Sequence, residues 1–249
     1  MTEINRCPST LMEGFATYSP KGSKKLFSGQ KVNPILEFNI DEFRNTSDIL
    51  DAIHRISVSG VQEKFPAIID QGRIRISLNE ERSTYILKPA PWDKTLQNRK
   101  QIPANEHITM QIASQVYGIQ TAANGDAHLK NFSLILQESD YRLAPAYDLL
   151  NTGLHVNSDD FGLDGGLSFN IEKSDIMAKT GHPCRLDFER FGKQIGIVET
   201  RLKRILGKYM QIPDETLRLI DHSFLNDKMK RTYIRIINER INRFIRISE

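Results

Sequence analysis

The sequence lacks the features of a disulfide-stabilised, zinc-binding or membrane-spanning protein. Its two cysteines, Cys7 and Cys184, are far apart and neither belongs to a C-x-x-C pair, so we expect free thiols in a reducing compartment. The six histidines show no zinc-ligand spacing. No run of about 18 apolar residues occurs, and the first residues lack the apolar core of a signal peptide. We therefore expect a cytoplasmic protein without membrane association.

A large excess of one charge is also missing. The 34 Lys and Arg residues nearly balance the 31 Asp and Glu residues, and a net charge of +3 does not by itself indicate a nucleic-acid partner. Hydrophobic residues make up 39% of the chain and charged residues 26%, as in ordinary globular proteins. The 249 residues are enough for one large or two small domains.

The first half of the chain predicts a small sheet and one clear helix. Alternating apolar and polar residues predict an antiparallel meander of three strands. A helix should follow, with Asn105 as N-cap, Glu106 in its first turn and Gly118 just past its end. The strands are expected at 64–69, 73–78 and 84–88, within an otherwise irregular N-terminal region that has a plausible helix at 40–54.

The second half predicts mainly helices. Two short strands are expected first, at 132–136 and 141–143, followed by a long loop at 151–168. Apolar residues at three- and four-residue spacing then predict helices over 188–210 and 214–247.

The stretch Asn124–Asn131 carries the chemistry around which we interpret the chain. Asp126 and Asn131 are five residues apart, and Asp148 follows after the two short strands. In phosphoryl transfer, one carboxylate orients the attacking hydroxyl, while an amide oxygen and a second carboxylate hold metal ions on the phosphates. Lys130 lies between them, either touching the transferred phosphate or simply exposed. An Asp-x4-Asn pattern also occurs by chance, so its value depends on the upstream residues.

Two upstream features complete the pattern. Ser57–Lys64 contains a single glycine, and its backbone N–H groups either approach phosphate oxygens or form an ordinary turn. Lys88, at the end of a strand, and Glu106, on the next helix, can form the pair that positions a phosphate-binding lysine. The alternative is an exposed strand-end lysine and a glutamate that favours the helix dipole. The order of all these residues favours a kinase.

Five segments resemble the HipA-like serine/threonine kinases, which are toxins of bacterial toxin–antitoxin systems. The resemblance covers roughly residues 55–150 and implies an α+β, bilobal protein-kinase-like fold. A small strand-rich N-lobe would comprise residues 1–120, and a helical C-lobe residues 121–249. The five segments are Ser59–Lys64, Ile86–Pro89, Asn105–His107, Gly125–Asn131 and Ala144–Asp148.

The resemblance also implies ATP and Mg²⁺ as cofactors and assigns roles to individual residues. Asp126 would be the catalytic base, with Asn131 and Asp148 as metal ligands. Ser57 and Ser59 would be autophosphorylated, and the protein substrate would be an aminoacyl-tRNA synthetase. The implied ATP and phosphate contacts are Ser59, Gly60, Gln62, Lys64, Lys88, Glu106 and Lys130.

The short region before Ser57 is similar to the HipT branch, which lacks an extra N-terminal subdomain. This implies a helix-turn-helix antitoxin from the same operon and a separate small protein that resembles the missing subdomain. Contact with DNA would be indirect, through the antitoxin.

One departure from the family stands out. Between Gly118 and Asp126 there is no sequence for the adenine-holding hinge, which is missing at about residues 121–123. Either a fuller protein carries a segment that this sequence lacks, which we expect, or the chain is a true deletion. The second case favours a catalytically inactive module that binds an antitoxin–DNA complex. A small-molecule or lipid kinase on the same fold is a further alternative.

Overall fold

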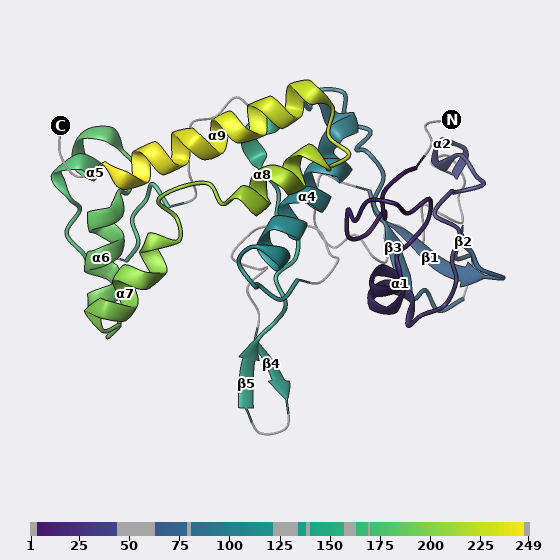
Figure 1. Cartoon of the computed structure of the whole chain (residues 1–249), viewed down its shortest axis with the longest axis horizontal. Helices are drawn as coiled ribbons and strands as arrows, with labels where there is room; N and C mark the ends of the chain where they lie inside the picture. The colour runs from purple at the N-terminus through teal and green to yellow at the C-terminus, as the bar shows by residue number, and fades with distance from the viewer. Residues whose placement is uncertain are drawn as a thin grey trace.

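The computed structural model describes residues 4–43, 63–78, 81–121, 134–137, 140–156, 163–168 and 170–246. A sheet with two short helices lies at one end, and a central group of helices connects it to a second helical group at the other end (Figure 1). The architecture is α+β, with an N-terminal antiparallel sheet and a helical C-terminal region, as predicted. The N-terminal elements are α1 (Pro20–Phe27), α2 (Ile40–Phe43), β1 (Phe65–Asp70), β2 (Arg73–Ile76) and β3 (Tyr85–Leu87).

The three strands are antiparallel, but they do not form the predicted meander. Their order is β2-β1-β3, so the third strand pairs with the first and not with the second. Ala67 of β1 lies opposite Ile76 on one side and Tyr85 on the other. Phe65 and Ala67 are completely buried. The most deeply buried strand, β1, is the central strand of the sheet. In this position both of its edges are paired and its side chains are covered.

Helix α1 was missed by the sequence analysis, which treated this region as irregular. Ser19 caps it by accepting a hydrogen bond from the Gly22 N–H, and Pro20 occupies the first turn. Both are ordinary helix-start signals. Helix α2 begins at Ile40, where a helix was predicted, and residues 44–54 of that prediction lie outside the described chain.

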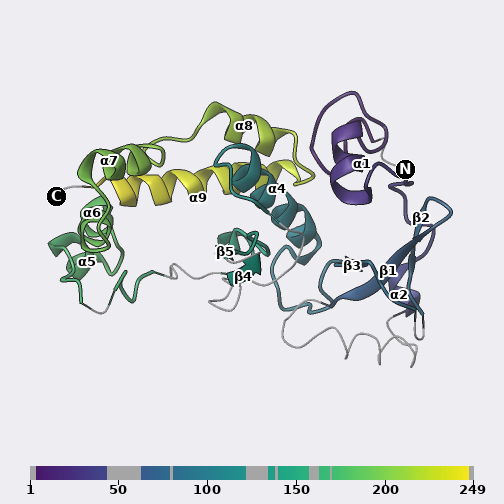
Figure 2. The ribbon, with the colours of Figure 1, turned by 90° about the horizontal axis from the view of Figure 1, so that it is seen from below.

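The central helical group contains the largest apolar core. It consists of α4, α8 and α9, and α8 packs against both of the others (Figure 2). Ile108 of α4 and Leu219 and Ile220 of α8 are completely buried in this core. A single turn of 3-10 helix, η1, leads into α4. The bounds are η1 (Arg99–Gln101), α4 (Ile102–Gln115), α8 (Asp214–Asp221) and α9 (Asp227–Ile245).

Two predictions about α4 have different outcomes. Gly118 has a φ of +66°, which is the left-handed conformation expected of a glycine past a helix end. Asn105, however, is not the N-cap, because α4 already begins at Ile102 with Pro103 in its first turn. Proline is well tolerated there, so the helix starts four residues earlier than the Asn–Glu signal suggested.

The second helical group lies at the far end of α9. It contains α5 (Asp175–Thr180), α6 (Arg185–Gln194) and α7 (Glu199–Gly207). The predicted continuous helices are therefore wrong in two places. Gly196, with a φ of +80°, separates α6 from α7, and residues 222–226 separate α8 from α9. Helix also begins earlier than predicted, at α5.

A hairpin of β4 (Leu134–Gln137) and β5 (Asp140–Leu143) projects from the central group (Figure 1). Both strands were predicted. In the structure, Leu136 lies opposite Tyr141. In the described part of the predicted loop that follows, Thr152–Leu154 form a short 3-10 turn, η3. Within the described residues, no helix is both long and apolar enough to span a membrane.

Candidate functional site

A lysine held between two carboxylates joins three distant segments of the chain. The Lys88 Nζ lies 3.0 Å from Glu106 Oε1 and 2.5 Å from Asp148 Oδ1. The three side chains are only 12%, 17% and 3% exposed, respectively. Buried charges are costly unless they are paired, so this arrangement fixes the lysine tightly. We call these three residues the Lys88 cluster.

Each member of the Lys88 cluster is positioned by its local structure. Lys88 directly follows β3, and Pro89 prevents the strand from continuing. Glu106 lies on α4, whose apolar stripe is anchored in the central core. Asp148 has a φ of +58°. A non-glycine residue in this conformation costs free energy and persists only where its surroundings enforce it, as they often do at functional sites.

The charges of the Lys88 cluster do not cancel. One ammonium group faces two carboxylates, so the cluster carries a net negative charge when all three groups are ionised. Burial raises the pKa of Glu106, the positive charge of Lys88 opposes this effect, and the nearby Asp148 carboxylate raises the pKa further. The net direction is upward. The cluster therefore favours either a proton on Glu106 or an additional cation nearby.

Asn105, next to Glu106, ties α4 to the segment that follows Asp148. Its Nδ2 donates to the Asn151 carbonyl oxygen and to His155 Nε2, at 2.9 Å in each case. Its Oδ1 accepts from the Asn151 N–H at 3.3 Å. Because His155 Nε2 accepts this bond, Nδ1 carries the proton and donates to the Gln97 carbonyl oxygen at 2.9 Å. Burial lowers the pKa of His155, in keeping with this neutral form.

This supporting role of Asn105 was not predicted. The residue is completely buried, and its side-chain amide makes two hydrogen bonds to the backbone of Asn151. These bonds connect α4 to the Asn151 segment. The sequence pattern Asn105–Glu106 was interpreted as the start of a helix. Asn105 was therefore predicted to be an N-cap, which is wrong. The bonds to residues 46 and 50 positions away have no local sequence signal.

Asp148 is suited to hold a metal ion. Its Oδ2 is buried and has no hydrogen-bond partner among the described residues. An unpaired carboxylate oxygen is the kind of ligand that Mg²⁺ takes. The described chain holds no group of three or more His, Cys, Asp or Glu residues that could bind a metal. Mg²⁺ bound with a nucleotide needs only one or two protein carboxylates, so the residues present fit that use.

Thr121, the last described residue before the Asn124–Asn131 stretch, lies beside Ala146, close in sequence to Asp148. The Ala146 N–H donates to the Gln120 carbonyl oxygen at 2.8 Å, and Thr121 forms a parallel bridge with Ala146. The chain that leads to the predicted catalytic stretch therefore passes beside the segment that carries Asp148.

The remaining predicted site residues fall into two groups. Lys64 directly precedes β1 and is not among the recorded partners of the Lys88 cluster. Seven of the predicted site residues lie outside the described part of the chain, namely Ser57, Ser59, Gly60, Gln62, Asp126, Lys130 and Asn131.

Comparison with known proteins finds a similarity that covers the second part of this site. Residues 120–216 match the family model of the HipA-like C-terminal domain. The match begins beside the Thr121–Ala146 bridge. It includes Asp126, Lys130, Asn131 and Asp148, whereas Lys88 and Glu106 precede it. No curated protein matches the chain. The N-terminal sheet and helical C-terminal region are consistent with a HipA kinase-like fold.

Proposed function

We propose that this chain is an ATP-dependent serine/threonine protein kinase. The observation that carries the proposal is the Lys88 cluster, in which a strand lysine contacts a helix glutamate and the aspartate predicted to hold metal. Protein kinases use a strand lysine fixed by a helix glutamate to position phosphates. The HipA-like domain that contains Asp148 supports the same class of activity.

Within this proposal, each site residue has a separate role in phosphoryl transfer. Lys88 exchanges its bond to Asp148 for a phosphate oxygen, while Glu106 continues to hold its ammonium group. The exchange leaves both Asp148 oxygens available to Mg²⁺, which neutralises charge on the phosphates when it is bound. Asp126 accepts the proton of the attacking hydroxyl, and Asn131 provides a second metal contact. Lys130 contacts the transferred phosphate.

We further propose that the kinase is a toxin of the HipT-type branch. Its substrate would be an aminoacyl-tRNA synthetase, and Ser57 and Ser59 would be autophosphorylation sites. Its partners would be a helix-turn-helix antitoxin of the same operon and a small protein similar to the N-terminal subdomain of HipA. These proposals rest on the sequence resemblance alone.

Incubation of the purified chain with ATP and Mg²⁺ tests the kinase activity. Mass spectrometry should find phosphate on Ser57 or Ser59 in the wild type, and none in an Asp126→Asn variant. Asp140→Asn is the matched control, because this exposed hairpin carboxylate should leave phosphorylation unchanged. Absence of phosphate from the wild type, or its persistence in Asp126→Asn, would refute catalysis by this site.

A catalytically inactive module that binds an antitoxin–DNA complex is the second candidate. The connection after α4 favours it, because only residues 116–120 separate the helix from Thr121, which is already bridged to Ala146. This leaves no room for the hinge strands implied by the resemblance. Purified antitoxin and operator DNA should then bind wild type and Lys88→Met equally well, while neither protein binds ATP.

A further inference from the structure

The segment 14–36, which contains α1, carries charge of one sign. It has no Arg, Asp or Glu, and its four lysines are Lys21, Lys24, Lys25 and Lys31. The whole chain has a net charge of +3, so these lysines exceed its entire surplus of positive charge. Three of them lie on α1 itself, and a hydrogen bond of 2.8 Å from the Ser23 hydroxyl to the Gln30 carbonyl oxygen keeps Lys31 beside the helix.

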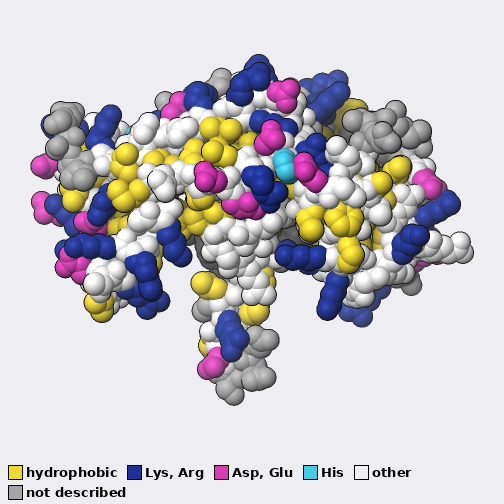
Figure 3. Space-filling model, in the orientation of Figure 1, with side chains coloured by type: hydrophobic (Ala, Val, Ile, Leu, Met, Phe, Trp, Pro, Cys, Tyr) yellow, Lys and Arg dark blue, Asp and Glu magenta, His cyan; other side chains and the backbone are white. Residues whose placement is uncertain are grey.

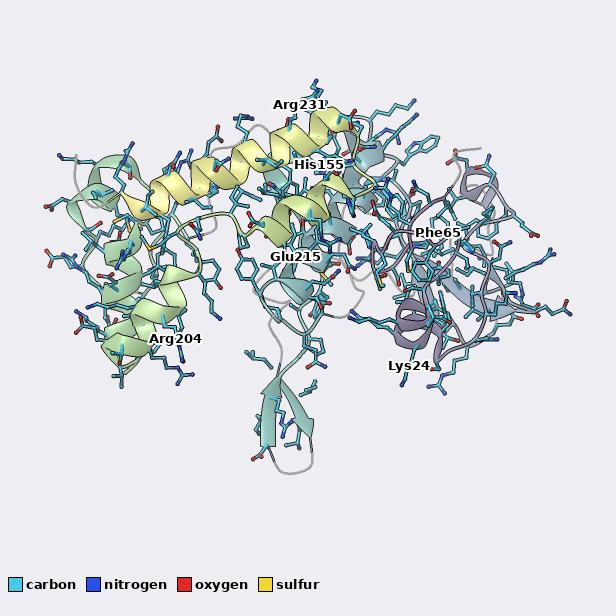
Figure 4. All side chains as sticks on the ribbon, viewed as in Figure 1. Lys24, Phe65, His155, Arg204, Glu215 and Arg231 are labelled. Atoms are coloured by element: carbon cyan, nitrogen blue, oxygen red, sulfur yellow. The ribbon has the colours of Figure 1, made fainter. Side chains whose placement is uncertain are left out.

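The three lysines of α1 share one side of the helix. Lys21, Lys24 and Lys25 have the three- and four-residue spacing of neighbours on a helix surface, and all three are exposed. The buried residues of α1, Gly22 and Phe27, lie on its other sides. Figure 4 shows Lys24 extending from α1 toward the edge of the molecule, and Figure 3 shows dark-blue Lys and Arg side chains along this lower edge. We call these three residues the α1 lysine face.

No carboxylate neutralises the α1 lysine face within the described part of the chain. None of its three lysines takes part in an ion pair there. The two acidic residues that flank the segment have other partners, because Glu37 pairs with Arg73 and Glu13 Oε1 lies 3.3 Å from His222 Nε2. The positive charge of the face is therefore left for a partner outside the chain.

The uncompensated charge also acts inside the protein. Like charges four residues apart, as at Lys21 and Lys25, destabilise a helix. Burial and the nearby positive charge of Lys25 lower the pKa of His107 to about 4, against the opposing effect of a hydrogen bond to the Ser9 carbonyl oxygen. An anionic partner on the α1 lysine face would relieve the repulsion between its lysines.

The residue types favour a phosphate backbone over an acidic protein or a membrane. All cations of the face are lysines, which bind phosphate as point charges, whereas bidentate recognition of carboxylates uses arginine. A membrane-surface helix needs an exposed apolar side, but Phe27 is buried against Tyr18 and Tyr85, with ring centroids 4.8 and 5.7 Å away. Because these rings pack on one another, they are not arranged to stack on the bases of a single strand.

We propose that the α1 lysine face binds the phosphate backbone of a double-stranded nucleic acid. The contact is electrostatic and independent of base sequence, because point charges that reach phosphates carry no sequence information. Duplex DNA and duplex RNA share this backbone chemistry. None of the three lysines belongs to the Lys88 cluster, so binding requires neither ATP nor a catalytic residue.

Fluorescence anisotropy of the full chain with a labelled DNA duplex of about 20 base pairs, and with the RNA duplex of the same sequence, tests this face. Each phosphate contact releases counterions, so with three contacts the affinity should fall roughly 40-fold between 50 and 200 mM salt. Replacing Lys21, Lys24 and Lys25 together with glutamine should remove this salt dependence and weaken binding by more than roughly tenfold at the lower salt concentration. Replacing the same residues with arginine should preserve both.

The matched control replaces Lys193, Lys203 and Lys208 with glutamine. These exposed lysines belong to the second helical group, and their removal changes the net charge by the same amount. Lys203 already pairs with Glu199, so no free phosphate contact is lost there. The control variant should bind both duplexes like the wild type, and circular dichroism should show the same folded chain for all the variants.

Three results would overturn the proposal. The first is absence of binding of either duplex by folded wild-type protein at the lower salt concentration. The second is an equal loss of binding in the two glutamine variants, which would reveal an effect of net charge alone. The third is displacement of the duplex by polyglutamate, or by phosphatidylserine vesicles, as readily as by unlabelled duplex, which would assign the face to an acidic protein or a membrane. These readouts do not depend on kinase activity, so the α1 lysine face and the proposed function can fail separately.

Discussion

Replacing Lys88 with methionine would remove the only described cation in contact with both carboxylates of its cluster, with little change in side-chain length. Asp148 and Glu106 would remain buried, at 3% and 17% side-chain exposure, without the ammonium group between them. Removing one partner of a buried ion pair typically costs 3–5 kcal/mol. We expect a loss near the lower end, about 3 kcal/mol, because Glu106 can relieve the repulsion by taking up a proton.

The loss should depend on pH in a direction set by Glu106. Its pKa is already raised in the folded protein, and removal of Lys88 takes away the positive charge that opposes this shift. A carboxyl with a folded pKa above its unfolded value, about 4.3, favours folding when protonated. The difference between variant and wild type should therefore be small below about pH 4 and grow as the pH rises through the folded pKa.

Urea unfolding measures this difference, provided the slope of the transition is unchanged. Lys203→Met is the matched control, because Lys203 pairs with Glu199 in an exposed ion pair, with both side chains about 60% exposed. Its midpoint should not move measurably. Equal midpoints for Lys88→Met and Lys203→Met, or a Lys88→Met deficit that grows toward low pH, would refute the account of the Lys88 cluster.

Three further substitutions test other parts of the fold by the same urea measurement. Asn105→Ala should lower the free energy of unfolding by about 3 kcal/mol, because its backbone and histidine partners lose their hydrogen bonds. A loss no larger than that caused by an Asn→Ala substitution on the surface would contradict this. Burial opposes ionisation of Asp187, but hydrogen bonds from Cys184 and Ser174 lower its pKa. The stability that the ionised Asp187 provides is therefore present above about pH 3.9 and is lost as the pH falls through the lowered pKa. Asp187→Asn should then cost about 2 kcal/mol at pH 7 and much less near pH 2, and a pH-independent cost would be inconsistent. Gly192→Ala places a Cβ 2.5 Å from a Leu202 methyl group and should cost about 1–3 kcal/mol, whereas Gly207→Ala, which meets no atom within 4 Å, should not destabilise.

The sequence was most informative where a local pattern decides the structure. Alternation identified the strand that carries Ile74 and Ile76, and four-residue spacing placed Ile108 and Ile112 in the core. Strand order was not predictable in the same way, because the central position of β1 follows from tertiary burial of Phe65. Helix ends were also poorly placed, since Pro103 was not recognised as a first-turn residue of α4.

The Lys88–Glu106 pair was predicted from order and residue type, and the structure confirms the contact. The bond between Lys88 and Asp148 was not predicted, because it joins residues 60 positions apart and depends on tertiary packing. The support from Asn105 was missed for the same reason. The role assignments of Asp126 and Asn131 remain predictions, because both residues lie outside the described chain.

Calorimetric titration with ATP, in Mg²⁺ and in EDTA, tests most directly whether the Lys88 cluster is a nucleotide site. The account predicts binding by the wild type in Mg²⁺, much weaker binding in EDTA, and loss of binding in Lys88→Met and Asp148→Asn, with Lys203→Met unchanged. A folded wild-type chain that does not bind ATP in Mg²⁺, or an Asp148→Asn variant that binds as tightly as wild type, would contradict it.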